Sequence, residues 1–237
     1  MLKIEHLTKK YGDKVAVDDL SLHIEAGEIY GFIGHNGAGK TTTLKSCAGI
    51  LGFDEGDIFI DGMSIKNNPI GCKKLMAYIP DNPDLYNFMS GIKYLNFIAD
   101  VYGVSSDERA RKIDELAEMF EIKNDLASPI SSYSHGMKQK LALISALIHG
   151  PKLILMDEPF VGLDPIASHR LKETMRKMCD MGGAIFFSTH VLEVAEKLCD
   201  KVAIIKNGKL IASGTMDEVK GDSSLEDVFL ELEDKER

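Results

Sequence analysis

The stretch GHNGAGKTT, Gly34 to Thr42, decides the fold of this chain. It fits the pattern GxxxxGK[ST], and it lies between the apolar run EIYGFIG and the segment KTTTLKSCAGIL. The apolar run is typical of a strand buried on both faces, and the second segment is typical of a helix. A strand before this pattern and a helix after it are the context in which it forms a phosphate-binding loop.

The residue types of this loop suit the phosphates of a nucleoside triphosphate. Glycines let backbone N–H groups turn toward phosphate oxygens, and the N-terminus of the following helix adds partial positive charge. We expect the Lys40 ammonium to reach the terminal phosphates and the Thr41 hydroxyl to be a ligand for Mg²⁺. The loop alone leaves kinases, GTPases and motor ATPases as alternatives. The residues expected to surround the phosphates are Gly34, His35, Asn36, Gly37, Ala38, Gly39, Lys40, Thr41 and Thr42.

Two adjacent carboxylates end a second apolar run, KLILMDE. The carboxyl ends of parallel strands form the ligand-binding edge of an α/β sheet, so Asp157 and Glu158 are expected there. Neighbouring strand residues point to opposite faces, which predicts different roles for the two acids. We expect Asp157 to hold Mg²⁺ through water and Glu158 to polarise an attacking water as general base.

The order of the predicted elements gives the fold class and its parts. Strands alternate with helices along most of the chain, which predicts an α/β fold with a mainly parallel sheet. The start differs, because LKIEHL and VAVDDLSLHI alternate apolar and polar residues around a turn and so predict paired strands. Helical periodicity marks 86–149 as an inserted subdomain between core segments 1–85 and 150–237, and an amphipathic helix is expected over 222–237.

Bulk properties exclude several classes of function. The chain of 237 residues has a formal net charge of -9, which argues against nucleic acid as the main partner. No apolar run approaches the roughly 20 residues that span a bilayer, and the N-terminus lacks the apolar core of a signal peptide. The four cysteines form no CxxC pair, as is typical of free thiols in a reducing cytosol.

With these motifs in place, the chain resembles the ATP-binding subunit of ABC transporters over nearly its whole length. YSHGM, which begins at Tyr133, resembles the LSGGQ signature of that family. GLDP supplies Asp164, which matches the loop that crosses the dimer interface, and STH ends in His190, which matches the histidine that senses the γ-phosphate. Tyr11 matches the aromatic residue that stacks on adenine, and Asp81 stands where the family usually has glutamine.

The resemblance implies one domain, a P-loop NTPase (RecA-like) core with an N-terminal antiparallel β subdomain and an inserted helical subdomain that carries the signature. It also implies a dimer, homomeric or paired with another ATPase subunit, that holds two ATP molecules head to tail. Glu158 and His190 would be catalytic in one subunit, while the signature of the other completes the site. That signature consists of Ser134, His135 and Gly136. The implied Mg²⁺ ligands are Thr41, Asp81 and Asp157.

Several positions depart from the family pattern or leave a choice open. Asp81 is shorter than glutamine and charged, so it can still ligate Mg²⁺ as a hard oxygen donor. His135 replaces the first glycine of the signature, whereas Ser134 and Gly136 are retained. Val17 can line the adenine pocket or belong to the core.

The resemblance implies a motor that hydrolyses ATP and drives a separate integral-membrane permease from the inner face of the cell membrane, in the cytoplasm. The signature segment and the C-terminal ending are similar to those of multidrug and antibiotic-peptide exporters, so export is the expected direction. A soluble ABC ATPase that acts on ribosomes or DNA is one alternative. A regulatory ABC system without a defined cargo is another.

Overall fold

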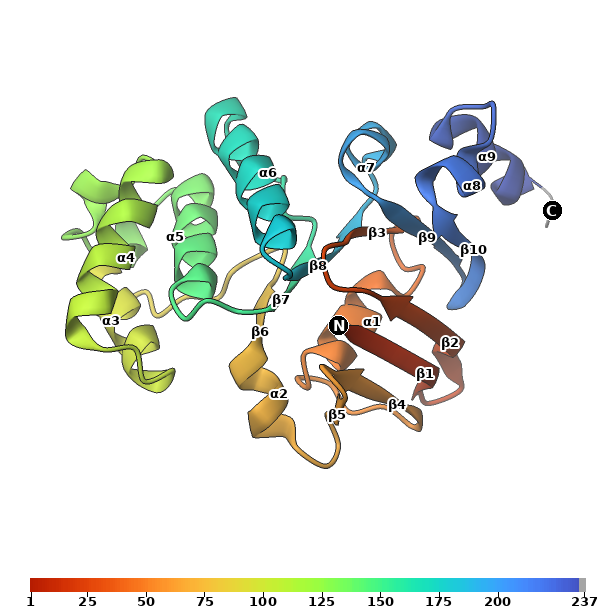
Figure 1. The fold of residues 1–237 in the computed structure, drawn as a ribbon, viewed down its shortest axis with the longest axis horizontal. Coiled ribbons are helices and arrows are strands. Elements are labelled where there is room, and N and C mark those ends of the chain that lie inside the picture. Colours follow the sequence, from red (N-terminus) through yellow and green to blue (C-terminus); the bar gives the residue numbers. More distant parts are fainter. Residues whose placement is uncertain (235–237) are drawn as a thin grey trace.

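In the computed structural model, which describes residues 1–234, the chain forms two sheets flanked by helices (Figure 1). The larger sheet of this described part has six strands in the order β10-β9-β3-β8-β7-β6. Neighbouring strands are parallel except β10, which is antiparallel to β9. The mainly parallel α/β fold predicted from the sequence is therefore confirmed. The strands are β3 (Ile29–Ile33), β6 (Met76–Ile79), β7 (Leu153–Asp157), β8 (Ala184–Thr189), β9 (Lys201–Lys206) and β10 (Lys209–Thr215).

The central strands of this sheet are buried on both faces. In β3, Ile29 and Ile33 belong to one hydrophobic cluster, while Tyr30 and Phe32 belong to the other. The same alternation holds in β7 and β8, so each face of the sheet carries its own core. A strand covered on both faces needs a continuous apolar run, which is the pattern seen in the sequence.

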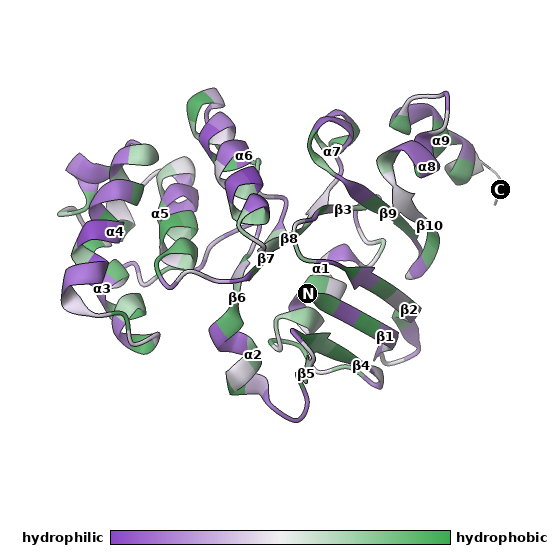
Figure 2. Ribbon diagram, in the orientation of Figure 1, coloured by the Kyte–Doolittle hydropathy of each residue, from purple (hydrophilic) through white to green (hydrophobic). Residues whose placement is uncertain are grey.

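The smaller sheet is antiparallel, as predicted for the start of the chain. Within residues 1–234 its order is β2-β1-β4-β5, and a turn at Gly12, with φ 58°, joins β1 to β2. His6 adopts φ 51° where the register shifts, which lets Leu7 as well as Ile4 face the core. Figure 2 shows hydrophobic and hydrophilic residues alternating along β1, as expected of a strand with one buried face. Its strands are β1 (Leu2–Tyr11), β2 (Lys14–Ile24), β4 (Glu55–Ile60) and β5 (Met63–Ser64).

The helices between β6 and β7 lie together at the left of Figure 1. They occupy the segment for which the sequence predicts an inserted helical subdomain. Helix α4 is mostly hydrophilic in Figure 2, and it contributes Ile113 and Ala117 to the core. The helices are α3 (Gly91–Val101), α4 (Ser106–Met119) and α5 (His135–Leu147), with short 3-10 turns at Lys123–Asp125 and Ile130–Ser132.

The remaining helices pack beside the larger sheet. They are α1 (Lys40–Cys47), α2 (Pro69–Leu75), α6 (Pro165–Asp180), α7 (Leu192–Leu198), α8 (Met216–Lys220) and α9 (Leu225–Asp234). The sequence reading missed α2 and α8, although Thr215 and Glu218 form a complete capping box at the start of α8. None of the helices within residues 1–234 combines the length and the apolar character needed to cross a membrane.

The C-terminal helix is shorter at its start than the predicted 222–237. Helix α9 begins at Leu225, and positions 235–237 of the prediction lie outside the described residues. Ser224 and Asp227 cap it, since each backbone N–H donates to the other residue's side chain. Leu225 is fully buried, and Phe229 packs against the larger core cluster, so the apolar face of α9 covers its own domain.

Candidate functional site

The phosphate loop follows β3 and leads directly into α1, as the sequence predicts. Gly37 and Gly39 have φ angles of 86° and 112°, which residues other than glycine rarely adopt. A Cβ at Gly39 would also lie 2.5 Å from the backbone oxygen of Ala16. The glycine pattern is therefore required by the backbone path, whichever anion the loop binds.

Lys40 is held inside the curve of the loop. Its Nζ donates to the backbone oxygens of Gly34, at 2.6 Å, and His35, at 3.1 Å. The side chain is only 6% exposed, and burial lowers the pKa of Lys40, while the carboxylates of Glu158 and Asp157 act in the opposite direction. An ammonium surrounded by carbonyl dipoles and little water is placed to bind a strong anion.

Both carboxylate oxygens of Asp157 accept hydrogen bonds, although the residue is only 3% exposed. The Thr41 hydroxyl donates to Oδ2 at 2.6 Å, and the Ser188 hydroxyl donates to Oδ1 at 2.5 Å. Asp157 ends β7 and Ser188 is its direct partner on β8, so sheet register brings the two together. The carboxylate is thereby fixed beside the first turn of α1.

Glu158 leaves the strand in a left-handed turn, with φ 48°. The expectation that strand alternation separates the two acids is wrong in this detail, because β7 ends at Asp157. Oε1 of Glu158 lies 2.9 Å from Nδ1 of His190, without the alignment of a hydrogen bond, and 3.9 Å from Nζ of Lys40, which is an ion-pair distance. The turn thus carries this carboxylate toward two cationic or titratable side chains.

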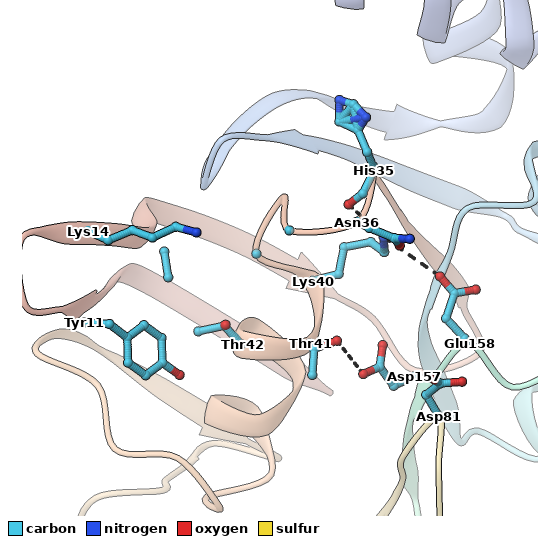
Figure 3. A pocket seen from close by; sticks show the side chains of 13 residues that line it. Tyr11, Lys14, His35, Asn36, Lys40, Thr41, Thr42, Asp81, Asp157 and Glu158 are labelled. Carbon is cyan, nitrogen blue, oxygen red and sulfur yellow. Dashed lines mark hydrogen bonds and ion pairs between the residues drawn. The ribbon is translucent and has the colours of Figure 1, made fainter.

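Lys40, Asp157 and Glu158 border a cavity of about 290 Å³ (Figure 3). His190 lies outside the lining of this cavity and borders a neighbouring pocket with His35 and Asn36. Tyr11 lies at one end and Glu158 at the other, and Asp81 lies beside Asp157. Among the loop residues that the structure describes, Gly34 and Ala38 lie outside the lining. Those that line the cavity are His35, Asn36, Gly37, Gly39, Lys40, Thr41 and Thr42.

The structure decides the choice that the sequence left open for Val17, and it shows where the side chain of His35 lies. Val17 is fully buried in the core, so it does not line the pocket, while Lys14 and Ala16 do. The side chain of His35 points away from the cavity in Figure 3, and its ring lies 5.8 Å from that of Phe229 in α9. The imidazole of His35 therefore faces the C-terminal helix. Its backbone oxygen accepts a hydrogen bond from Lys40 within the loop.

The signature lies on a different surface from the cavity. Ser134 caps α5 by accepting a hydrogen bond from the Met137 N–H at 3.2 Å, and Ser134 and His135 are exposed. A Cβ at Gly136 would lie 2.8 Å from the backbone oxygen of Gly162, so the start of α5 packs against the loop before α6. None of the three signature residues lines the cavity within residues 1–234.

Asp164 links this loop to the signature helix. It caps α6 by accepting from the Ala167 N–H at 2.8 Å, and its Oδ2 lies 2.7 Å from Nζ of Lys140 in α5. The Ala167 N–H and then the Lys140 ammonium lower the pKa of Asp164. The signature and the Asp164 loop consequently form one surface, and the resemblance to the family predicts that a second subunit contacts it.

The donors in the cavity fit a magnesium ion that shares its shell with phosphate. Thr41, Asp81 and Asp157 offer hard oxygen atoms at one end of the cavity. No group of three or more His, Cys, Asp or Glu side chains in the described part of the chain is arranged to hold a metal by itself. Mg²⁺ usually keeps several waters and takes one or two carboxylates plus substrate phosphates, so such a closed cluster is not required.

Comparison with known proteins agrees with this geometry. The profile described as "ABC transporter" matches residues 17–161, more than half of the chain. The ABC-type transporter ATP-binding protein EcsA of Bacillus subtilis is 34% identical over 98% of this chain and 96% of its own length. The linearmycin resistance ATP-binding protein LnrL of the same organism is 33% identical over 91% of this chain and 69% of its own length.

Solved structures show the same fold. The structure of an ATP-binding subunit of an ABC transporter superposes with a TM-score of 0.94 at 35% identity, covering 98% of this chain and 99% of that one. A dimeric ATP-binding cassette in a post-hydrolysis state, with bound ADP and phosphate, superposes with a TM-score of 0.82 at 21% identity, covering 91% and 99%. This chain therefore belongs to the ABC transporter family, as one of its ATP-binding subunits.

Proposed function

We propose that the chain hydrolyses ATP in a head-to-tail homodimer and thereby drives a membrane exporter. The observation that carries this proposal is the separation of two surfaces. The phosphate loop, Asp157 and Glu158 border one cavity, while the exposed signature at the start of α5 lies outside it. A second copy would place its signature over the cavity of the first, and the dimeric state of the solved ATP-binding cassette supports this arrangement.

The chemistry expected in the cavity is positioning and charge stabilisation, as in other phosphoryl transfers. Lys40 would bind the terminal phosphates, and Tyr11 would stack on the adenine at the other end. Glu158 would accept the proton of the water that attacks the γ-phosphorus, with ADP as the leaving group, and His190 would hold the Glu158 carboxylate and contact the γ-phosphate. When bound, Mg²⁺ would neutralise phosphate charge, with Thr41, Asp157 through water, and Asp81 as its protein donors.

The signature would complete this site from the other subunit. The exposed Ser134 hydroxyl and the start of α5 offer hydrogen-bond donors and the partial positive charge of a helix N-terminus to a phosphate. Because Asp164 is bonded to Lys140 on the same surface, the loop that contains it would lie at the subunit interface. Closure of the dimer would then require bound ATP, and hydrolysis of the ATP would weaken the contact between the subunits.

An aromatic surface beside the Asp81 segment supports a permease partner. Tyr86 stacks on Phe88 with ring centroids 5.8 Å apart, and it also contacts Tyr94 and Phe97 of α3. Phe88 is 83% exposed, and large apolar side chains grouped at a surface are typical of protein interfaces. This aromatic surface would receive cytoplasmic helices of the permease, and the chain would then lie on the inner face of the cell membrane. The name of LnrL, which confers linearmycin resistance, supports export.

Co-purification from native membranes tests this assignment against its alternatives. An integral-membrane partner would support the transporter, whereas ribosomes or DNA would support the soluble ABC ATPase instead. ATP-dependent movement of an antibiotic or drug in vesicles that contain the permease would then separate export from a regulatory ABC system without cargo.

A single substitution tests the aromatic surface. We expect Phe88→Asp to lower recovery of the membrane partner by about tenfold, because a buried aromatic anchor is worth about 1–3 kcal/mol at an interface. ATP binding by the isolated subunit should not change. Ile70→Asp is the matched control, since Ile70 is 70% exposed and lies on α2. Equal recovery of the partner by both variants and the wild type would place the docking surface elsewhere.

A further inference from the structure

We propose that Ser188 is a positioning residue that fixes Asp157 and Glu158 relative to each other and so sets the response of the site to Mg²⁺. The proposal rests on the proposed function of these two acids. The sequence prediction used only the histidine that ends the motif STH, and it gave Ser188 no role. The structure places its side chain, fully buried, between the two carboxylate residues.

One hydroxyl serves both neighbours. Ser188 Oγ carries a single proton, which it donates to Oδ1 of Asp157 at 2.5 Å. The same oxygen accepts the backbone N–H of Glu158 at 3.2 Å, and the backbone oxygen of Ser188 accepts that N–H at 3.2 Å as well. Consecutive hydrogen bonds of this kind polarise and strengthen each other. The Ser188 oxygen therefore couples the carboxylate of Asp157 to the backbone of Glu158.

The bond to Asp157 controls the orientation of its carboxylate. Thr41 holds Oδ2 at 2.6 Å from the side of α1, and Ser188 holds Oδ1 from the side of β8. With two donors the plane of the carboxylate is fixed. With Thr41 alone only one of the two carboxylate oxygens is held, and the group can rotate.

The bond to Glu158 supports an unfavourable backbone turn. A residue with a Cβ is disfavoured in the left-handed region, where Glu158 lies with φ 48°. Its N–H, shared between the two Ser188 oxygens, anchors that turn. This turn brings the Glu158 carboxylate to 2.9 Å from Nδ1 of His190. The hydrogen bonds at the backbone therefore help to position the side chain of the proposed catalytic base.

The proposal predicts a specific defect for Ser188→Ala. Oδ1 of Asp157 would be left buried without its donor. Loss of one hydrogen bond to a charged group changes a rate or binding constant by about tenfold or more. We expect kcat to fall about tenfold and the Mg²⁺ concentration for half-maximal ATP binding to rise about tenfold. Affinity for ATP in EDTA should stay within about twofold of the wild type. Binding is followed with a fluorescent ATP analogue, over a Mg²⁺ titration.

Two further variants separate the hydroxyl from packing. Ser188→Thr keeps a hydroxyl and should stay within about threefold of the wild type in its Mg²⁺ requirement. Ser46→Ala is the matched control, because Ser46 is equally buried and its hydroxyl donates only to the backbone oxygen of Thr42, at 2.9 Å. It should leave the Mg²⁺ titration unchanged.

The outcomes distinguish this proposal from the function on which it rests. A Ser188→Ala variant with the wild-type kcat and Mg²⁺ titration would overturn the positioning role, and so would a Ser188→Thr variant as defective as the alanine variant. If Glu158→Gln in the same assay hydrolyses ATP at the wild-type rate, the proposed function of the acids fails instead. Ser188→Cys, which has a weak donor, should lie between alanine and wild type, and it replaces the alanine variant if that one does not fold.

Discussion

Replacing Glu158 by glutamine should lower kcat for ATP hydrolysis by about 10²- to 10⁴-fold, the contribution usual for a positioned general base. Glutamine has nearly the same shape, but an NH₂ donor replaces one acceptor oxygen and the amide cannot accept the proton of the attacking water. The carboxylate is in place for this role, at 13% side-chain exposure and 3.9 Å from Nζ of Lys40. ATP binding should be retained, because Lys40 and the loop backbone are untouched, and release of phosphate measures the turnover.

The matched control for this variant is Glu193→Gln. Glu193 lies in the first turn of α7 and is exposed in an ion pair with Lys197. Its replacement should leave turnover within about twofold of the wild-type value, since exposed ion pairs contribute little to the stability of the fold. Equal rates for the wild type and Glu158→Gln would remove Glu158 from the reaction and leave its contact with His190 as a structural one.

Replacing Lys40 by alanine should weaken ATP binding by about 10- to 150-fold, since hydrogen bonds to charged groups are worth about 1.5–3 kcal/mol. The variant should remain folded. Lys40 is a buried cation that donates to the carbonyls of Gly34 and His35, and its removal takes a costly desolvated charge out of the interior. Titration with a fluorescent ATP analogue gives the affinity, and thermal unfolding checks the fold.

Lys45→Ala serves as the control in that titration, because Lys45 is in the last turn of the same helix. We expect its affinity for ATP to match the wild type. If Lys40→Ala binds ATP as tightly as Lys45→Ala does, the loop does not bind the terminal phosphates through its lysine.

The position of the phosphate loop between a strand and a helix could be predicted because its sequence signal is local. Consecutive residues supply the glycines, the lysine and the hydroxyl, and β3 and α1 flank them as expected. The fold class followed from hydrophobic periodicity in the same way. The antiparallel start of the chain was predicted because strand alternation and a Gly12 turn are also local signals.

The features that the sequence could not predict depend on contacts between distant segments. Ser188 meets Asp157 only because β8 pairs with β7 in one register, across 31 positions of sequence. The left-handed turn at Glu158 has no signal in the residue type, since glutamate is not a residue that favours it. Lys14 and Ala16 line the cavity because the start of β2 lies beside the loop, where a Cβ at Gly39 would be 2.5 Å from the Ala16 backbone oxygen. This contact joins separate segments, and the pattern of the strand alone does not reveal it.

Mixing two inactive variants tests the central claim, that each ATP site is shared between two copies of the chain. Ser134→Asp keeps a capping side chain on α5 but would place a negative charge against the partner's phosphate, so it should be inactive alone, as Glu158→Gln should be. In a mixed dimer, Glu158 of the first variant and Ser134 of the second would form one intact site.

Random reassortment of the two variants makes half of the dimers mixed, so we expect the equimolar mixture to recover about one quarter of the wild-type turnover if sites act independently. The measurement is phosphate release before and after mixing. Recovery would support a site built from Glu158 of one subunit and Ser134 of the other. A mixture as inactive as its two components would contradict the shared site.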